Sequence, residues 1–444
     1  MRSFRGGVHP ADHKSDTCEK PIIDLAPPKE LVYPLSQHIG KPAVACVKTG
    51  DSVLMGQKIA EADGFVSANL HASVSGKVKT VEKRLHPNGV MMDAIVIEND
   101  FEDRMDPSVL DRSADYHDLS KEEILARIRE AGIVGMGGAT FPTHVKLSPP
   151  AEAKIDYVIV NGSECEPYLT SDHRVMLENP EEVLDGLCIV LQIFGLQCGY
   201  VGIEDNKPAA IERMKEAAAK YQNPKIHIVP LKTKYPQGAE KQLIDAISGR
   251  KIKPGQLPWQ SGCIVLNIDT AASITRAVTF KMPLVQRIVT LGGDALKQPM
   301  NYRVRIGTPF SYVIAQSGGT TETPRKILMG GPMMGTAVPD SDVPVIKGSS
   351  GILALGEKAA HLAKESACIR CAKCVYVCPM QLQPNLLDLK ARINDYDALD
   401  KLHIYDCIEC GSCAFVCPSK RRQVQQIKVA KGKMRAMQTK QGGK

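Results

Sequence analysis

The alternation of hydrophobic and polar positions changes character along the chain. In residues 36–98, short runs of alternating hydrophobic and polar residues are separated by the turn sequences TGD, ADG and VSG, which predicts a small domain of short strands. Residues 117–280 instead alternate helical segments with apolar strands such as IDYVIV. This order predicts an α/β domain with a mostly parallel sheet, whose ligands bind at the carboxyl ends of the strands.

The last third of the chain shows two further patterns. Residues 285–346 return to strand-like runs broken by glycine and proline, which predicts a small β-rich domain. Residues 355–425 are rich in cysteine and contain one helical stretch, LQPNLLDLKARINDYDALDKLHIYD. A chain of 444 residues is too long for one ordinary core, so we expect three or four domains.

One uncharged stretch, residues 186–203, has to be considered as a membrane span. It contains Gln192, Gln197 and four glycines, and Gly195 is a suitable helix stop before the strand-like CGYVGI. We therefore expect a helix, a turn and a strand within an α/β core, and no transmembrane segment. The start, MRSFRGGVHPADHK, lacks the apolar core of a secretory signal.

Composition and charge narrow the choice of function. Hydrophobic residues make up 43% of the chain and charged residues 24%, as in soluble globular proteins. The net charge of +7 is spread among interspersed acids and bases, so nucleic-acid binding is not expected. The basic tail, residues 426–444, is interpreted either as a solvated or disordered end or as a contact with an acidic partner or a membrane surface.

Eight of the 14 cysteines form two quartets with the spacing C-x2-C-x2-C-x3-C-P, at residues 368–379 and 407–418. Structural zinc, the alternative, usually takes separate cysteine pairs, whereas this spacing is typical of two [4Fe–4S] clusters. In such proteins the fourth cysteine ligates the other cluster. The predicted ligands are Cys368, Cys371, Cys374 and Cys417 for cluster 1, and Cys407, Cys410, Cys413 and Cys378 for cluster 2.

The remaining cysteines, scattered along the chain, are interpreted as mostly buried free thiols of a reducing cytosol. They are Cys18, Cys46, Cys165, Cys188, Cys198 and Cys263.

A glycine-rich loop, AGIVGMGGATFPTHVK, spans residues 131–146. It matches neither the G-x-G-x-x-G nucleotide fingerprint nor a P-loop. Gly135, Gly137 and Gly138 remove side chains where a planar or phosphorylated ligand could approach the backbone. From these residues alone, a purely structural turn is an equally good interpretation.

Several motifs carry a family resemblance. GMGGATFPTHVK, NGSECEPY, YPQGAEKQL and LNIDTAA resemble, in the same order, segments of the NADH-binding 51-kDa subunit of respiratory complex I. With FRGGVHP, PLSQHIGKPA, GGPMMG and the two quartets, nearly the whole chain resembles the RnfC family of the Rnf electron-transport complex. The resemblance implies a multidomain α/β protein: a lipoyl-like barrel-sandwich hybrid domain (1–115), a Rossmann-like FMN/NADH core (116–284), an SLBB β-grasp domain (285–350), a ferredoxin-like 2[4Fe–4S] domain (351–425) and the basic tail (426–444).

Two of these domains are interpreted as scaffolds. The hybrid domain lacks a lysine at a hairpin tip of the kind that lipoyl and biotinyl domains modify. In the SLBB domain, Met333 and Met334 are interpreted as packing residues rather than ligands.

The resemblance also implies a cofactor site. The loop glycines would lie against the flavin, Lys146 would supply a cation near its phosphate, and the later motifs would hold flavin and nicotinamide nucleotide. The implied cofactor-binding residues are Gly135, Gly137, Gly138, Phe141, Lys146, Asn161, Glu164, Glu166, Gly238, Glu240, Asn267 and Thr270. The chain departs from the complex I pattern at Met136, Thr140, His144, Ser163 and Ala239.

The implied function is that of a peripheral subunit on the cytoplasmic face of a bacterial membrane complex. FMN would exchange a hydride with NAD(H), and the two clusters would pass single electrons, so no catalytic side chain is assigned. The complex would transfer electrons between ferredoxin and NAD+, coupled to Na+ or H+ translocation. Its other subunits, including membrane subunits and a ferredoxin-type subunit, would be the partners.

Two alternatives to this function remain open. One is a non-catalytic iron–sulfur adaptor with a vestigial nucleotide fold, which the substitutions in the loop keep under consideration. The other is a diaphorase subunit of a soluble hydrogenase or formate dehydrogenase. Such a subunit would normally lack both the hybrid domain and the paired quartets.

Overall fold

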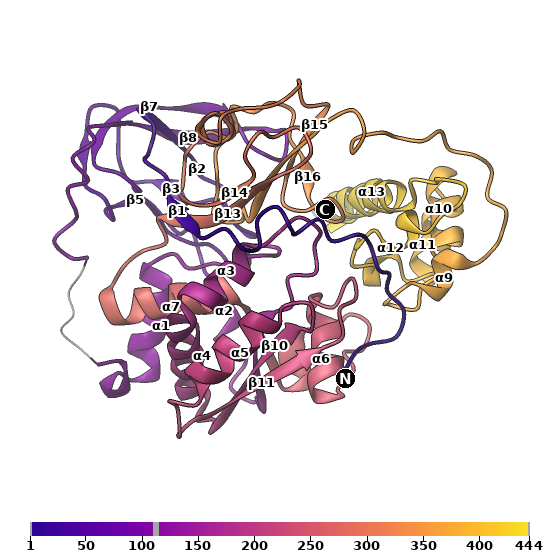
Figure 1. Cartoon of the computed structure of the whole chain (residues 1–444), viewed down its shortest axis with the longest axis horizontal. Helices are drawn as coiled ribbons and strands as arrows, with labels where there is room; N and C mark the ends of the chain where they lie inside the picture. The colour runs from indigo at the N-terminus through magenta and orange to yellow at the C-terminus, as the bar shows by residue number, and fades with distance from the viewer. Residues whose placement is uncertain (1, 110–114, 443–444) are drawn as a thin grey trace.

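The computed structural model describes residues 2–109 and 115–442, and the chain forms four regions packed against one another (Figure 1). The early strands, drawn in indigo and violet, lie beside the orange strands of the later β region. The magenta α/β region lies below them, and the yellow helices of the cysteine-rich region lie to one side.

The first region contains two small antiparallel sheets, as the alternating pattern predicts. Hydrophobic residues such as Leu31, Ile59 and Ile95 are fully buried between them. One sheet has the order β2-β8-β7-β4, with β2 Glu30–Pro34, β8 Met91–Asn99, β7 Gly76–Leu85 and β4 Ser52–Val53. The other has the order β3-β5-β6, with β3 Val44–Ala45, β5 Lys58–Glu61 and β6 Leu70–His71.

The α/β region contains the predicted parallel sheet, in the order β11-β10-β9-β12. Helices α4, α5 and α7 bury one face of it, and α6 buries the other. The strands are β9 Tyr157–Gly162, β10 Cys198–Glu204, β11 Lys225–Leu231 and β12 Cys263–Asn267. The helices are α1 Lys121–Glu130, α2 Thr143–Lys146, α3 Ser171–Glu178, α4 Pro180–Phe194, α5 Pro208–Ala218, α6 Glu240–Ser248 and α7 Ile268–Phe280, with short 3-10 turns at η1 Tyr116–Asp118 and η2 Pro258–Ser261.

The uncharged stretch forms the predicted helix, turn and strand. Helix α4 begins at Pro180 and ends at Gly195, whose φ of 63° is left-handed, and β10 follows. At Gly186 the helix crosses α7 closely, because a Cβ there would lie 2.0 Å from the Ala271 carbonyl oxygen. Among the residues that the structure describes, no helix has both the length and the apolar character required to cross a bilayer.

The later β region is a six-stranded mixed sheet in the order β1-β14-β13-β17-β15-β16. The apolar residues of this sheet pack against helix α8 Phe310–Gln316. Buried Lys347 joins this region to two others, since its Nζ donates to Asn69 O at 2.5 Å and to Gly132 O at 2.6 Å. The strands are β1 Ile22–Asp24, β13 Gln286–Gly292, β14 Met300–Arg305, β15 Lys326–Met329, β16 Thr336–Ala337 and β17 Gly351–Leu355.

The cysteine-rich region is built from short helices around a small core. Leu387, Leu399 and Ile404 pack there against Ile427 and Met434 of the last helix. The elements are α9 Lys373–Tyr376, α10 Pro384–Arg392, α11 Tyr396–Lys401, η3 Ile404–Asp406, α12 Ser412–Phe415 and α13 Gln423–Gly442.

The structure differs from the expected domain boundaries in three places. The N-terminal segment leaves the hybrid domain, since Arg2 and Val8 bridge to the α/β region and β1 joins the six-stranded sheet. β17 extends that sheet beyond residue 350. Helix α13 runs through the expected boundary at residue 425, so the tail is helical to residue 442, and its last two residues lie outside the described part.

Candidate functional site

The carboxyl edge of the parallel sheet brings the predicted residues of separate motifs together. Asn161, the residue before the end of β9, is the register partner of Asn267, the last residue of β12. Gly238 lies beside Asn161, whose Nδ2 donates to the Gly238 carbonyl at 2.8 Å. Gly137 lies beside Asn267, because a Cβ at Gly137 would be 2.8 Å from Asn267 Nδ2.

The glycine loop is tied to this edge at its buried residues and open at its tip. Met136 N donates to Thr270 Oγ1 at 2.9 Å, and Gly135 N donates to Phe141 O at 2.8 Å. Gly137 and Gly138 are exposed, and open space surrounds the Cβ position of Gly138. The tip therefore presents bare backbone at the carboxyl edge of the sheet, which suits the close approach of a ligand.

Lys146, at the end of α2, extends toward α6 and β12. Its Nζ lies 2.9 Å from Glu240 Oε1 and donates to the Val265 carbonyl at 2.9 Å. The Lys146 side chain is 28% exposed, so it is not sealed from solvent by these contacts.

Several of the predicted side chains also hold the protein backbone. Glu164 accepts from the amides of Asp172 and His173 at the start of α3. Asn267 caps α7, accepting from Asp269 N at 2.9 Å, and its Nδ2 donates to Asp172 Oδ2 at 2.6 Å. These contacts give the residues a structural role, and their direct role toward a cofactor stays a prediction.

Burial reduces the negative charge of the site. The pKa of Asp172 is raised to about 8 by burial and then by the neighbouring Glu164 and Asp269 carboxylates. Burial likewise raises the pKa of Glu166 and of Glu204. A raised pKa favours the neutral form of a carboxyl, which lessens its repulsion of a phosphorylated ligand.

Lys14, which sequence reasoning missed, anchors the acidic segment from the N-terminal side. Its buried Nζ donates to the carbonyls of Glu164 at 3.0 Å, of Glu166 at 2.9 Å and of Leu169. No local pattern predicts this, because the partners are about 150 residues away in the sequence.

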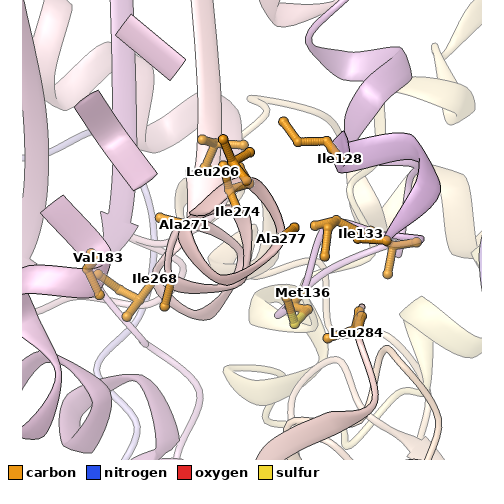
Figure 2. Packing of buried hydrophobic residues seen from close by; sticks show 14 of the residues in the cluster. Ile128, Ile133, Met136, Val183, Leu266, Ile268, Ala271, Ile274, Ala277 and Leu284 are labelled. Atoms are coloured by element: carbon orange, nitrogen blue, oxygen red, sulfur yellow. The ribbon is translucent and has the colours of Figure 1, made fainter. Parts of the chain in front are cut away.

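Arg287 was also missed, and it contacts Met136, one of the departures from the complex I pattern. Met136 packs in the apolar layer with Ala277 and Leu284 (Figure 2). The buried guanidinium of Arg287 contacts Met136 Sδ and pairs with Asp269 at the start of α7. Met136 therefore supports the glycine loop by packing beneath it. The positive charge beside Met136 is that of Arg287 in β13.

The residues at this edge fit a phosphorylated, planar cofactor. They offer exposed glycine backbone, a reachable ammonium group and two terminal amides. In the described part of the chain, Ser163 Oγ and both amide atoms of Gln237 are buried without a hydrogen-bond partner. These atoms lie in the two loops that also carry Asn161 and Gly238, so polar groups are available there for a ligand.

The two predicted cluster ligand sets surround two separate cavities. One cavity is lined by Cys368, Cys371, Cys374 and Cys417, and the other by Cys378, Cys407, Cys410 and Cys413. Each cavity thus takes its fourth thiol from the other quartet, as the crossed ligation predicts. Across the described residues, no three ligand side chains converge on a point suited to a single metal ion.

The local backbone is the same in both quartets. Ala372 and Gly411 are left-handed, with φ values of 58° and 83°, and each precedes a one-turn helix that carries the third cysteine. Burial raises the pKa of Cys407 to about 11, so ligation has to release its proton. The donor set and its shape fit two [4Fe–4S] clusters.

The six cysteines outside the quartets are free, as predicted, but their exposure varies. Cys188 and Cys263 are buried, whereas Cys46 is exposed. The expectation that most of them are buried was therefore wrong, since Cys18, Cys165 and Cys198 are partly exposed and Cys46 directly follows the short strand β3 at the surface.

Four family models match the chain in sequence order. They are described as the RnfC barrel sandwich hybrid domain (residues 2–102), the Nuo51 FMN-binding domain (128–276), the SLBB domain (288–337) and the 4Fe-4S dicluster domain (367–421). The matches confirm the predicted fold class.

Two curated relatives are similar over nearly their whole length. The C subunit of the "Proton-translocating ferredoxin:NAD(+) oxidoreductase complex" of Clostridium ljungdahlii is 50% identical over 438 residues, covering 98% of this chain and 95% of the relative. The C subunit of the "Na(+)-translocating ferredoxin:NAD(+) oxidoreductase complex" of Acetobacterium woodii is 46% identical over 439 residues, covering 99% of this chain and 98% of the relative.

Among solved structures, a chain of an NAD+-reducing [NiFe]-hydrogenase in the H2-reduced state shares the fold. The TM-score is 0.51 and the identity 17%, with 71% of this chain and 63% of that chain covered. At this identity the similarity concerns the fold alone.

Proposed function

This chain belongs to the RnfC family of the ion-translocating ferredoxin:NAD(+) oxidoreductase (Rnf) complexes, and from that membership we propose its function. It exchanges a hydride between NAD(H) and FMN at the carboxyl edge of the parallel sheet. It passes the electrons singly through two [4Fe–4S] clusters to or from partner subunits. When bound, FMN supplies the conversion between a two-electron hydride and one-electron carriers.

One observation carries this proposal: the cavity of cluster 2 adjoins the loops of the nucleotide edge. Buried Cys410 forms an apolar contact cluster with Tyr235 and Val8, against which Cys165 and Met333 pack. Tyr235 and Cys165 lie in the loops that carry Gly238 and Glu166. A hydride acceptor bound at the edge and a cluster bound in this cavity would therefore lie on opposite sides of the same two loops.

The residues at the edge have separate tasks in this proposal. The tip of the glycine loop, at Gly137 and Gly138, lies against the flavin, and Lys146 neutralises its phosphate. Asn161 and Asn267 orient the ligand by hydrogen bonds from the strand ends. Glu164 and Glu166 shape the nucleotide side of the site, and the buried loops exclude water from it.

Cluster 1 provides the contact with other subunits in this proposal. Cys368 and Cys371 are exposed, as are Ile369 and Tyr376 beside them, at 67% and 79%. A cluster with an exposed edge can exchange electrons with an external carrier. We propose that the carrier is a ferredoxin-type subunit of the complex, and that the chain is held by the membrane subunits on the cytoplasmic face.

The function is tested by diaphorase activity of the anaerobically prepared chain. We expect protein reconstituted with iron, sulfide and FMN to reduce a one-electron dye with NADH, and protein without FMN to be inactive. Iron uptake without FMN binding or NADH oxidation would instead support the adaptor alternative.

A further inference from the structure

The junction between the cysteine-rich region and the nucleotide-binding region is centred on one phenol. Tyr235 is 2% exposed, and its hydroxyl lies 2.7 Å from the Cys410 carbonyl oxygen and 3.3 Å from Glu166 Oε1. A phenol has one proton, and the shorter contact indicates that it is donated to the Cys410 carbonyl. The hydroxyl therefore bonds directly to the backbone of a cluster 2 ligand.

The backbone of Tyr235 is fixed by the N-terminal segment. Tyr235 N donates to Val8 O at 2.9 Å, and Val8 N donates to Tyr235 O at 2.8 Å. The same segment reaches the other quartet, because Gly7 N donates to Val377 O at 2.8 Å, next to ligand Cys378. The phenol thus projects toward the cluster 2 cavity from a backbone that two hydrogen bonds hold in place.

The turn that receives the hydrogen bond is held on its other side by Met333. A Cβ at Gly411 would lie 3.0 Å from Met333 O, so the turn and Met333 are in close contact. Glu166 in turn holds the loop that carries Met333. Its carboxylate oxygens accept from Met333 N at 3.0 Å and from Met334 N at 2.9 Å. Glu166 and Tyr235 together therefore form a seat for the Cys410–Gly411 turn.

We propose that Tyr235 is a positioning residue for electron transfer, which holds cluster 2 against the nucleotide-binding loops and raises its reduction potential. This rests on the proposed function. The hydroxyl dipole points its positive end at the carbonyl of buried Cys410. Hydrogen bonds near the ligands of a cluster stabilise its reduced, more negative state, and low local polarity strengthens the effect.

The electron balance of the step is simple. Oxidation of one NADH yields NAD+, one proton and two electrons. The electrons pass one at a time through cluster 2, which is reduced and reoxidised in each passage, and then through cluster 1 to two one-electron acceptors. A higher potential of cluster 2 favours each entry, and a fixed position keeps the transfer distance short.

The test is a mediated, dithionite-driven redox titration of the full chain, followed by electron paramagnetic resonance. It does not depend on FMN or NADH, so it can fail independently of the proposed function. In Tyr235→Phe, which keeps the ring but removes the hydroxyl, we expect the cluster 2 potential to fall. A tenfold change in its equilibrium corresponds to about 59 mV for one electron. The potential of cluster 1 should stay unchanged.

Two further variants make the outcome decisive. Tyr405→Phe, a half-exposed tyrosine of the same region, is the matched control and should shift neither potential. Replacement of Tyr235 by 3-fluorotyrosine, a stronger hydrogen-bond donor, should raise the cluster 2 potential. If Tyr235→Phe loses its iron, the cluster 2 potential of the 3-fluorotyrosine protein tests the proposal alone. Unchanged potentials in both Tyr235 variants, or equal shifts in both clusters, would overturn the proposal.

Discussion

Asn161 and Asn267 are register partners at the carboxyl ends of adjacent parallel strands. Each side chain touches a glycine of a different loop: Asn161 bonds to Gly238, and Asn267 lies against Gly137. Motifs spread over more than a hundred residues of sequence are therefore gathered at one edge. Substitutions at this edge, at the residues that support it and at the neighbouring clusters should therefore have separable effects on FMN affinity, stability and iron content.

The close contact between Gly137 and Asn267 predicts a specific sensitivity of flavin binding. In Gly137→Ala, the new Cβ would meet Asn267 Nδ2 at 2.8 Å, and the φ of 70° is unfavourable for alanine. We expect FMN affinity, measured by fluorescence titration, to fall by about tenfold or more, since each 1.4 kcal/mol is tenfold. Gly195→Ala, also left-handed but with open space around it, should leave FMN affinity unchanged. Equal affinities in both variants would contradict the role of the loop.

The buried carboxyl of Asp172 predicts a pH dependence of stability. Its pKa is raised to about 8, mainly by burial, whereas in the unfolded chain it is near the ordinary 3.8. Because the folded state then holds a proton that the unfolded state has released, stability should decline as pH rises from about 4 to about 8.

Asp172→Asn keeps the shape of the side chain and removes the charge. We expect it to lessen the loss of stability between pH 5 and pH 8 by up to about 4 kcal/mol, because each pH unit over which the folded state keeps the extra proton contributes about 1.4 kcal/mol. Anaerobic thermal unfolding at several pH values measures this. Glu216→Gln, an exposed change on α5, is the control and should follow the native chain. A native-like pH profile for Asp172→Asn would show that the carboxyl is ionised throughout.

Lys14 predicts that the N-terminal segment supports the site. Lys14→Met keeps the aliphatic stem but leaves three carbonyls, one of them buried, without this donor. We expect a destabilisation of about 2–4 kcal/mol and weaker retention of FMN. Lys20→Met, which removes a single contact to Pro299 O, should cost much less. The melting temperature and the flavin-to-protein ratio check both variants, and equal losses in the two would contradict the role of Lys14.

The last helix predicts a dependence of cluster 2 on the tail. Lys431, 4% exposed, donates to Cys407 O at 2.6 Å and pairs with Glu409 at 2.9 Å. Removal of residues 426–444, which keeps Gln423 at the cluster 1 cavity, should therefore reduce the iron content from about eight to about four atoms per chain, since each cluster holds four. Removal of residues 437–444 should leave it unchanged. Full iron content in the longer deletion would contradict the role of α13 in supporting cluster 2.

Local patterns predicted a large part of this architecture. The alternation in residues 36–98, the helix–turn–strand around Gly195 and both cluster ligand sets depend on short spacings that a single sequence displays. The tail helix was missed because its many basic residues obscure an apolar row formed by Val424, Ile427, Ala430 and Met434.

The supports of the site could not be predicted in the same way. The contacts of Lys14 with Glu164 and of Tyr235 with Cys410 join residues 150 and 175 positions apart. Such pairs are created by the packing of separate regions, and no spacing in the sequence encodes them. The motifs thus identified the chemistry, and the structure identified what holds it in position.

The most direct measurement of the central claim compares NADH-dependent cluster reduction in two ligand variants, monitored by electron paramagnetic resonance. In Cys371→Ser, which removes a ligand of cluster 1, NADH should still reduce cluster 2. In Cys413→Ser, which removes a ligand of cluster 2, NADH should no longer reduce cluster 1, although dithionite should. Rapid NADH reduction of cluster 1 in Cys413→Ser would contradict the account, because electrons would then reach the outer cluster without passing the one beside the nucleotide edge.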